Sequence, residues 1–373
     1  MEEYKKTLVI SAVNIRDGGA LTILINLLDK IESNQNSYLR VIALVSEKKI
    51  FSHYKNVRLI EFPNVKKFWI LRIIFEYVRC FFISKKIKTD IWFSLHDMTP
   101  NVIAKKRIVY CHNPAPFYKI RLKDIYFDLR FFLFNLFYLY LYKINIKKNT
   151  LVLVQQNWVK NELSKFVDHA KIKICKPDIL HEKNSDKILV NNKIESKKNK
   201  KFIICYPAFP RTFKNIETIC EAVSNLPKEL KDNVELRLTI SGKENKYSKY
   251  IYSSYKVNKN IKFLNKLSRK RALEEIKNCD ILAFPSLLET FGLPIIEAKQ
   301  FNKILLLADL PYAKETCGTY EKVKFIDPED SNQWKLKIEQ IVSNKFLPDK
   351  NIFNDLVEKV YDGWDQTIEL IIK

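Results

Sequence analysis

The sequence predicts an α/β protein with two doubly wound parallel-sheet domains that follow one another along the chain. Three observations support this fold class. Apolar runs of strand length alternate with segments of helical period almost throughout, which is the pattern of a parallel α/β sheet. One polar, charged stretch at 181–200 interrupts the alternation. A length of 373 residues, 47% of them hydrophobic, is enough for two domains that each bury a core.

The first domain is expected over residues 1–185. Its candidate strands are the apolar runs at 7–13, 40–45, 57–62, 90–95, 107–112, 151–155 and 171–175. Helical spacing of apolar residues places its helices near 19–32, 68–86, 123–145 and 157–167. The alternation implies parallel strands with helices as crossovers.

The second domain is expected over residues 186–350, where the alternation restarts. Its candidate strands lie at 201–207, 234–241, 261–265, 280–285, 303–308 and 322–327. Its helices are expected from about 215, near 245–255, near 268–277 and from Pro294, because proline favours the first helical positions. A final helical stretch, 351–373, is long enough to pack back toward the N-terminal domain.

The charge balance favours an anionic partner. The chain has 65 basic and 42 acidic side chains, a formal net charge of +23. Nucleic acid, an anionic membrane surface and phosphorylated small molecules all fit, and a codon bias toward Lys, Asn and Ile would also raise the charge. Seven dispersed cysteines without a C-x-x-C pair, and an N-terminus unlike a signal peptide, predict a cytoplasmic protein with reduced thiols.

Two apolar segments, 68–83 and 125–142, have two possible roles. Charged residues break the first, and the uncharged core of the second, 131–142, is well under the roughly 20 residues that span a bilayer. Basic residues flank both, as in helices that lie on an anionic membrane. Helices that cover a parallel sheet would look similar, and both interpretations stay open.

The loops that follow strands form the expected ligand site, because doubly wound sheets bind ligands at the carboxyl ends of their strands. Four of six glycines, Gly18, Gly19, Gly242 and Gly292, directly follow predicted strands, where a backbone would approach a ligand. No dinucleotide-binding or P-loop motif is present. Arg211 and Lys214, in one such loop, form a suitable pair of cations for a diphosphate, although they could also be solvated surface residues.

The stretch SLLETFGLPIIEA, 286–298, places Glu289 and Glu297 on either side of a strand-to-helix loop. The free N–H groups and the dipole at the start of the helix favour an anion there. Glu297 could also simply complement the helix dipole, and Glu289 could be an ordinary loop residue.

The stretch from Asp280 to Gly318 resembles the donor-site signature of the retaining glycosyltransferases of family 4, also called group 1, which have the GT-B fold of two facing Rossmann-like domains. The resemblance extends to the glycine pair at 18–19, the HNP stretch at 112–114, the segment from Val154, and Arg211, Lys214 and Asn215. Two departures are the AKQFNK sequence after Glu297 and the short spacing of Arg211 and Lys214, which leave the donor undefined.

The resemblance implies a role for each matched position. Glu297 would bind the ribose of a nucleotide sugar, and Glu289 would contact the transferred sugar. The N–H groups of Thr290, Phe291, Gly292 and Leu293 would surround the sugar and phosphates, and Arg211 and Lys214 would neutralise the leaving diphosphate. The loop of Gly18 and Gly19 would face the phosphates or the acceptor. His112 would lie near the sugar, either in catalysis or only in positioning.

The family's usual setting implies a hexosyltransferase that assembles lipopolysaccharide, O-antigen or capsule on a lipid-linked acceptor. Such an enzyme would be cytoplasmic and peripheral at the inner face of an anionic membrane. It would need no metal cofactor, in keeping with the lack of a D-x-D pair, and no nucleic acid partner. A sugar-nucleotide epimerase of the same fold, and a basic membrane- or nucleic-acid-binding protein with an inactive enzyme fold, are the alternatives.

Overall fold

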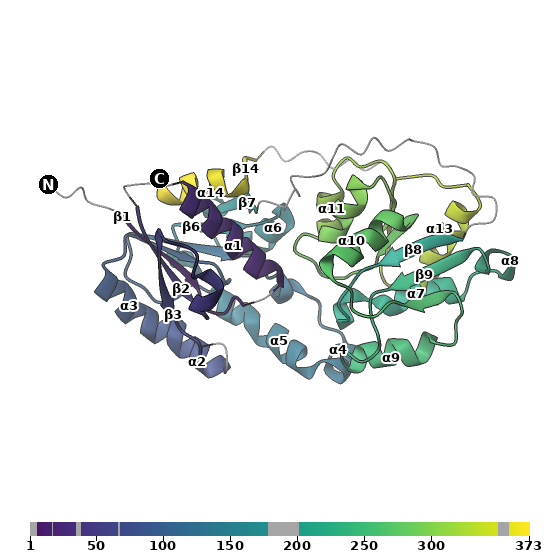
Figure 1. Cartoon of the computed structure of the whole chain (residues 1–373), viewed down its shortest axis with the longest axis horizontal. Helices are drawn as coiled ribbons and strands as arrows, with labels where there is room; N and C mark the ends of the chain where they lie inside the picture. The colour runs from purple at the N-terminus through teal and green to yellow at the C-terminus, as the bar shows by residue number, and fades with distance from the viewer. Residues whose placement is uncertain (1–5, 17, 35–38, 66–67, 178–200, 350–357) are drawn as a thin grey trace. The chain divides into compact units, whose positions relative to one another are not determined.

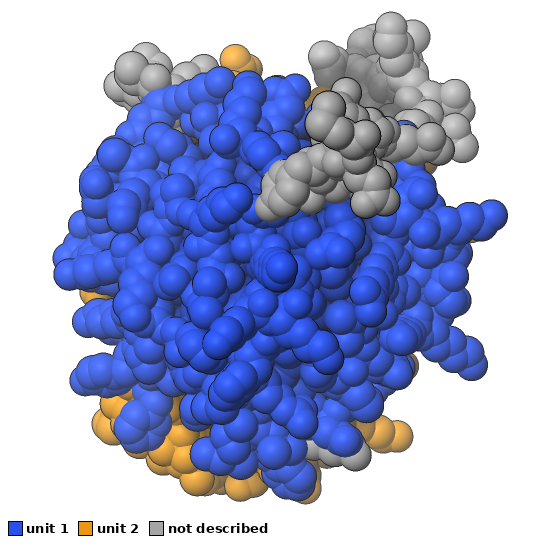
Figure 2. Space-filling model, turned by 90° about the vertical axis from the view of Figure 1, so that its left-hand side faces the viewer, with its two compact units in different colours: residues 1–117, 137–185, 356–373 blue, residues 118–136, 186–355 orange. Residues whose placement is uncertain are grey.

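A computed structural model describes residues 6–16, 18–34, 39–65, 68–177, 201–349 and 358–373. The chain divides into two compact units, coloured in Figure 2. Unit 1 comprises Met1–Phe117, Phe137–Ser185 and Leu356–Lys373, and unit 2 comprises Tyr118–Leu136 and Asp186–Asp355. The predicted domain boundaries at 185/186 and 350/351 lie outside the described residues.

Unit 1 contains an eight-stranded sheet, here called sheet A, with the order β14-β7-β6-β5-β4-β1-β2-β3 (Figure 1). Its strands are β1 (Lys6–Ala12), β2 (Leu39–Val45), β3 (Val57–Glu61), β4 (Ile91–Ser94), β5 (Lys106–Cys111), β6 (Leu151–Val154), β7 (Ile172–Lys176) and β14 (Val360–Asp362). Each neighbouring pair runs parallel. The chain runs outward from β1 to β3 and then returns to β4 on the other side of β1, so the strand order reverses between β1 and β4.

Side chains alternate between two cores, one on each face of sheet A. Leu8 and Ile10 of β1 belong to the core with Leu24 and Trp364, whereas Val9 belongs to the other core with Phe75. This period of two, with both faces apolar, explains why the strands read as nearly continuous apolar runs.

The helices of unit 1 cover both faces of sheet A. They are α1 (Gly18–Ser33), α2 (Trp69–Ile74), the π-helical turn η2 (Phe75–Arg79), α3 (Cys80–Ile87), α6 (Asn157–Ser164) and α14 (Gly363–Ile372), with short 3-10 turns at Lys48–Phe51, Ala115–Phe117, Ile146–Lys148 and His169–Lys171.

The predicted helix at 123–145 is two helices, α4 (Leu122–Phe127) and α5 (Leu129–Lys143), because Asp128 accepts the N–H of Phe131 at 3.0 Å and starts a new helix. Where the sequence predicted only helix at the C-terminal end, β14 precedes α14.

Unit 2 contains a six-stranded parallel sheet, here called sheet B, with the order β10-β9-β8-β11-β12-β13. Its strands are β8 (Phe202–Tyr206), β9 (Val234–Leu238), β10 (Ile261–Phe263), β11 (Ile281–Phe284), β12 (Ile304–Ala308) and β13 (Val323–Ile326). Its helices are α7 (Ile216–Ser224), α8 (Lys228–Lys231), α9 (Lys246–Tyr255), α10 (Arg269–Asn278), α11 (Leu293–Gln300), α12 (Pro311–Cys317) and α13 (Ser331–Val342), and η6 (Thr212–Lys214) is a 3-10 turn. The predicted class of two doubly wound parallel α/β domains is confirmed.

Two further features are the state of the cysteines and the apolar character of the helices. All seven cysteines are free and buried, so each behaves as a small apolar core residue. No helix of the described residues combines the length and the apolar character needed to cross a bilayer. The segment from Phe68 to Phe82 nevertheless exposes an apolar face, with Phe68, Ile70 and Phe82 all more than 60% exposed.

Candidate functional site

The order of strands in sheet B reverses between β8 and β11. The chain leaves β8 toward β9 and β10 and later returns to β11 on the other side of β8. The loops that leave the carboxyl ends of β8 and β11 therefore run in opposite directions. Doubly wound sheets bind ligands between such loops. These two loops carry Lys214 and Glu289, which were predicted as site residues from two separate stretches of the sequence.

The side chains of Lys214 and Glu289 form an ion pair, and each is 16% exposed. The hydroxyl of Ser286 donates to the same Oε1 atom of Glu289 at 2.8 Å. The ammonium group of Lys214 also lies 5.4 Å from the ring centre of Phe213 and 5.8 Å from that of Phe284. Partial burial among aromatic rings strengthens both the ion pair and the cation–π contacts, because little water screens them.

Two buried tyrosines fix the backbones of these loops. Tyr206 donates its hydroxyl to the carbonyl of Lys214 at 2.6 Å, and Tyr312 donates to the carbonyl of Ser286 at 2.6 Å. Burial, reinforced by the charge of Glu289, raises the pKa of both phenols well above the ordinary value. Both hydroxyls therefore stay protonated and remain donors at physiological pH.

Asn215 ends the loop after β8 in the left-handed conformation, with φ of 53°, and is the N-cap residue of α7. Its side-chain amide donates to the carbonyl of Pro328 at 2.6 Å, which ties the loop to the end of β13. Arg121, from the segment before α4, donates to the carbonyl of Thr212 at 2.7 Å. The loop that presents Lys214 is thus held from both sides.

The glycine of the FGLP turn is required by geometry. Gly292 has φ of 67°, and a Cβ there would lie 3.0 Å from Cδ1 of Ile295. Helix α11 starts at Leu293, with the proline at its second position, one residue before the predicted start. The turn therefore brings Thr290, Phe291, Gly292 and Leu293 directly to a helix N-terminus.

Glu297 lies on α11, and only 8% of its side chain is exposed. In the part of the chain that the structure describes, its carboxylate forms an ion pair with Arg269, the first residue of α10, whose side chain is 68% exposed. A buried carboxylate needs such a partner, because an unpaired charge in the interior is costly. The structure therefore separates the two glutamates, with Lys214 as the partner of one and Arg269 as the partner of the other.

Arg211 and Gly242, two further predicted site residues of unit 2, have contacts of their own. Arg211 forms an ion pair with Asp128 and lies over the ring of Phe209, 5.6 Å from its centre. Gly242 has φ of 83°, and a Cβ there would lie 2.6 Å from Cβ of Tyr252, so only glycine fits. The N–H of Gly242 donates to Glu244 at 3.0 Å.

In unit 1, the predicted residues follow β1 and β5. Gly18 and Gly19 form the first turn of α1, after β1. His112 and Asn113 follow β5 and donate their backbone N–H groups to one oxygen of Asp97, at 2.8 and 3.0 Å. Asp97 follows β4 with φ of 69°, and its other oxygen lies 4.0 Å from Nε2 of His112. Asp97 therefore fixes the turn that carries His112.

A buried polar cluster lies beside Asp97, at the point where the order of sheet A reverses. Nε2 of His96 lies 3.1 Å from Oε1 of Glu76, in the π-helical turn, and 3.2 Å from the hydroxyl of Ser11. Arg72 donates to the carbonyl of His96 at 3.0 Å. Burial raises the pKa of Glu76 to about 8, although Arg72 opposes the shift. Burial, with Arg72 and His112, lowers the pKa of His96 well below its usual value.

Five residues that contact the predicted site residues or the buried cluster were not predicted from the sequence: Asp97, His96, Glu76, Ser286 and Arg269. Asp97 and His96 directly follow a predicted strand, so the rule about carboxyl ends of strands could have found them. Ser286 lies in the loop already identified, whereas no local pattern connects Glu76 or Arg269 with a site.

Comparison with known proteins identifies a family for one segment of the chain. Residues 186–356 match the family described as "Glycosyl transferases group 1". No curated protein matches the sequence significantly.

The solved structures show the same fold over nearly the whole chain. The apo lipopolysaccharide outer core galactosyltransferase WaaB matches with a TM-score of 0.67 and 12% identity, over 98% of this chain and 99% of that one. WaaG, a glycosyltransferase involved in lipopolysaccharide biosynthesis, gives 0.62 and 14%, over 90% of each chain. Anabaena HepE in complex with UDP and glucose gives 0.58 and 14%, over 91% of each chain. Residues 186–356 therefore carry the sequence of the group 1 glycosyltransferases, and the chain has the GT-B fold.

Proposed function

We propose that this protein is a retaining hexosyltransferase that moves a sugar from a UDP-sugar to a lipid-linked glycan acceptor in the synthesis of a bacterial surface polysaccharide. The ion pair of Lys214 and Glu289, at the reversal point of the sheet that matches the family, carries the proposal. The complexes of Anabaena HepE with UDP and with UDP-glucose suggest uridine as the base. The lipopolysaccharide roles of WaaB and WaaG suggest the kind of product.

The chemistry follows from the charges at the two ends of the donor. As the bond between the sugar and the diphosphate breaks, negative charge grows on the diphosphate, and the ammonium group of Lys214 stabilises that charge more than it stabilises the ground state. Glu289 accepts hydrogen bonds from hydroxyls of the transferred sugar, and Glu297 accepts them from the ribose. The N–H groups at the start of α11 face the phosphates. We assign no protein nucleophile and no metal to the reaction.

Nucleotide binding is the first test of this proposal. UDP at 100 times its dissociation constant should stabilise the wild-type protein by roughly 2.7 kcal/mol, whereas GDP, dTDP and CMP should have little effect. Glu297→Ala and Lys214→Ala should each weaken the response, because each removes one contact to the nucleotide. Thermal shift measured without added metal checks this. If UDP gives no shift even at saturating concentration, the nucleotide assignment is wrong.

We also propose that the protein works at the cytoplasmic face of a membrane and docks through the apolar face of α2 and α3. Ile70 is 61% exposed and Phe82 is 64% exposed, and Lys85 and Lys86 follow on α3. Exposed apolar side chains beside cations are typical of helices that bind an anionic bilayer surface.

The double substitution Ile70→Ser and Phe82→Ser should remove most of the cosedimentation with phosphatidylglycerol vesicles, because it removes two of the most exposed apolar anchors of this face. The matched control is Val257→Ser with Leu347→Ser, which removes two even more exposed apolar side chains from unit 2. Equal vesicle binding by wild type and both doubles would exclude this face as the contact.

The alternative of a sugar-nucleotide epimerase is less favoured, because the family match is to transferases. Incubation with UDP-sugar alone separates the two activities. An epimerase would form a new sugar isomer without an acceptor, whereas a transferase would form at most free sugar and UDP by hydrolysis.

A further inference from the structure

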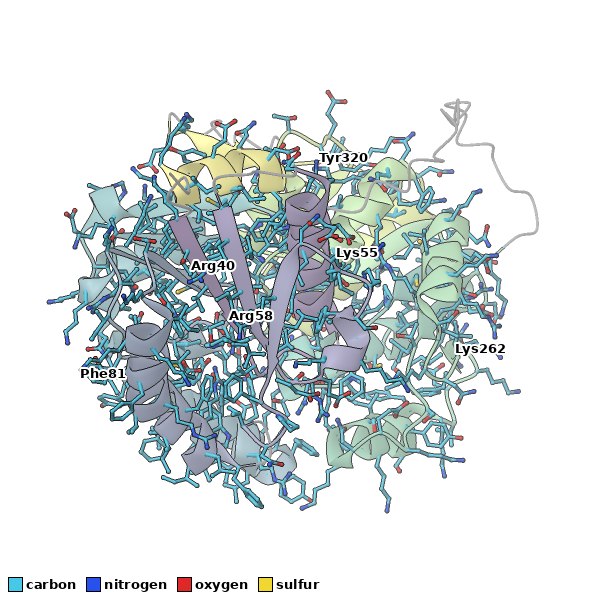
Figure 3. All side chains as sticks on the ribbon, turned by 60° about the vertical axis from the view of Figure 1, so that its left-hand side comes forward. Arg40, Lys55, Arg58, Phe81, Lys262 and Tyr320 are labelled. Carbon is cyan, nitrogen blue, oxygen red and sulfur yellow. The ribbon has the colours of Figure 1, made fainter. Side chains whose placement is uncertain are left out.

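The segment from His112 to Phe117, here called the β5 turn, leaves sheet A at the edge where its strands end. Figure 3 labels Arg40 and Arg58, which lie at the amino ends of β2 and β3. Because the strands run parallel, the β5 turn lies at the opposite edge of the sheet from these arginines. Doubly wound sheets bind their ligands at the carboxyl edge.

The backbone of Asn113 is held from two sides within this turn. Its N–H donates to Oδ1 of Asp97 at 3.0 Å, and its carbonyl accepts the hydroxyl of Tyr142 at 2.9 Å. Tyr142 is fully buried. Burial, reinforced by the charge of Asp97, raises the pKa of Tyr142 well above the ordinary value, so the hydroxyl remains a donor at physiological pH. The main chain of Asn113 is therefore fixed on both sides.

The side-chain amide of Asn113 is fixed as well. Its Oδ1 accepts the N–H of Ala115 at 3.0 Å, a bond to the residue two positions further on. Only the oxygen of an amide accepts such a bond, so Nδ2 and its two hydrogens point away from Ala115. Within the described part of the chain, Nδ2 has no acceptor, and the side chain is partly exposed. Asn113 thus presents an oriented hydrogen-bond donor directly after His112.

The geometry of the turn does not require an amide. The chain forms the same bond between a side chain and the N–H two residues on with aspartate at two other positions. Oδ1 of Asp168 accepts the N–H of Ala170 at 3.0 Å, and Oδ1 of Asp327 accepts that of Glu329 at 2.9 Å. An oxygen acceptor alone therefore suffices for the turn at Asn113, and its NH₂ group is available for another role.

A second asparagine shows how the chain uses such an NH₂ group elsewhere. Oδ1 of Asn258 accepts the N–H of Asn260 at 3.0 Å, and Nδ2 of Asn258 donates to the hydroxyl of Ser224 at 2.9 Å. At Asn258 both ends of the amide have protein partners. Asn113 differs from it in offering its donor end to a ligand.

Aromatic side chains lie beside the β5 turn. The ring of Phe117 lies 6.2 Å from that of Trp158 and 6.3 Å from that of Tyr142, edge to face in both pairs. Nε1 of Trp158 donates to Gln156 at 2.8 Å, which orients the indole. Phe117 and Trp158 are both partly exposed. Aromatic rings with a few oriented polar groups are the usual lining of a small-molecule site.

We propose that the β5 turn is a sugar subsite, in which Nδ2 of Asn113 donates a hydrogen bond to a sugar hydroxyl and Asp97 and Tyr142 are positioning residues. The inference rests on the proposed function, because sugar transfer is what brings a sugar to the protein. An uncharged amide suits a neutral hydroxyl, whereas phosphate groups are bound most strongly by charged donors. The hydroxyl belongs either to the transferred sugar or to the acceptor.

The test replaces Asn113 with aspartate, which keeps the oxygen for the N–H of Ala115 and removes the donor. Asn113→Asp should lower kcat/KM for transfer of labelled sugar from UDP-sugar to a lipid extract by about three- to tenfold, the usual net value of one neutral hydrogen bond. Asn113→Ser should show the same loss, because its hydroxyl also supports the turn but is too short to replace the amide. Serine is neutral, so it excludes the added charge as the cause.

The matched control is Asn258→Asp, which makes the same change in a turn of unit 2 and should keep the activity of the wild type. Thermal shift with UDP should be equal in wild type and in both Asn113 variants, because the subsite binds the sugar and not the nucleotide. Circular dichroism excludes unfolding as the cause of a loss.

The kinetic parameters distinguish the two sources of the hydroxyl. A higher KM for UDP-sugar assigns it to the transferred sugar, and a higher KM for the lipid extract assigns it to the acceptor. Activity of either Asn113 variant within a factor of about two of an active wild type would contradict the inference and leave the proposed function intact. An equal loss in Asn258→Asp would also contradict it. A wild type with neither a UDP response nor transfer would overturn both.

Discussion

Replacing Lys214 with alanine is expected to lower kcat/KM for sugar transfer by about 100- to 1,000-fold, the usual cost of losing one group that stabilises developing charge. The ammonium group is the cation that the structure holds closest to Glu289, and it is only 16% exposed. Its loss would leave the departing diphosphate without that charge, and would leave Glu289 with Ser286 as its remaining donor among the described side chains. The measurement is transfer of labelled sugar from UDP-sugar to a lipid extract.

The control for this prediction is Lys314→Ala. Lys314 forms an ion pair with Asp309 in the same unit, but both side chains are nearly half exposed, so the pair contributes little to stability. Activity of Lys314→Ala should match the wild type. A Lys214→Ala protein that folds normally and retains activity within a factor of about three would contradict the role given to Lys214.

The fold was predictable because both sheets are parallel and buried on both faces. Strands such as β12 and β6 consist almost entirely of apolar residues, so their length and alternation with helices identify them. The three-residue strand β14 could not be found in this way, because it depends on pairing with β7 far away in the sequence. The break at Asp128 had a local signal, a capping residue before a new helix, that the continuous apolar pattern concealed.

The candidate site was predictable where residues follow strands, and not where they pair across the fold. Lys214 and Glu289 follow β8 and β11, and adjacency of those strands explains their contact. In the segment 68–83, Arg72 and Glu76 served only as charges that interrupt a possible membrane span. The structure instead buries the carboxylate of Glu76, which lies in a π-helical turn, and Arg72 donates to the carbonyl of His96.

The buried cluster around Glu76 makes the stability of the protein depend on pH. The pKa of Glu76 is raised from 4.5 to about 8 by burial, so the folded state holds a proton that the unfolded state has lost over that interval. The contribution of Glu76 to the free energy of unfolding is largest below about pH 4.5. It decreases by about 1.4 kcal/mol per pH unit as the pH rises toward 8.

His96 acts in the opposite direction at lower pH. Its pKa is held well below 6.5, so stability decreases as the pH falls below 6.5. The two effects oppose each other between about 4.5 and 6.5, and the effect of Glu76 remains alone between 6.5 and 8. Comparing the wild-type protein with a variant at position 76 isolates the effect of Glu76 on the free energy of unfolding.

Glu76→Gln is therefore expected to stabilise the protein relative to wild type, by an amount that grows with pH and reaches about 3 kcal/mol at pH 7, because glutamine keeps the shape of the neutral acid and never ionises. Urea unfolding of both proteins at several pH values from 5 to 8 measures the difference. Glu61→Gln, which removes an exposed carboxylate of the same unit, should show no such trend. A constant difference between Glu76→Gln and wild type across this range would mean that Glu76 is ionised in the folded protein, with Arg72 rather than a proton balancing its charge.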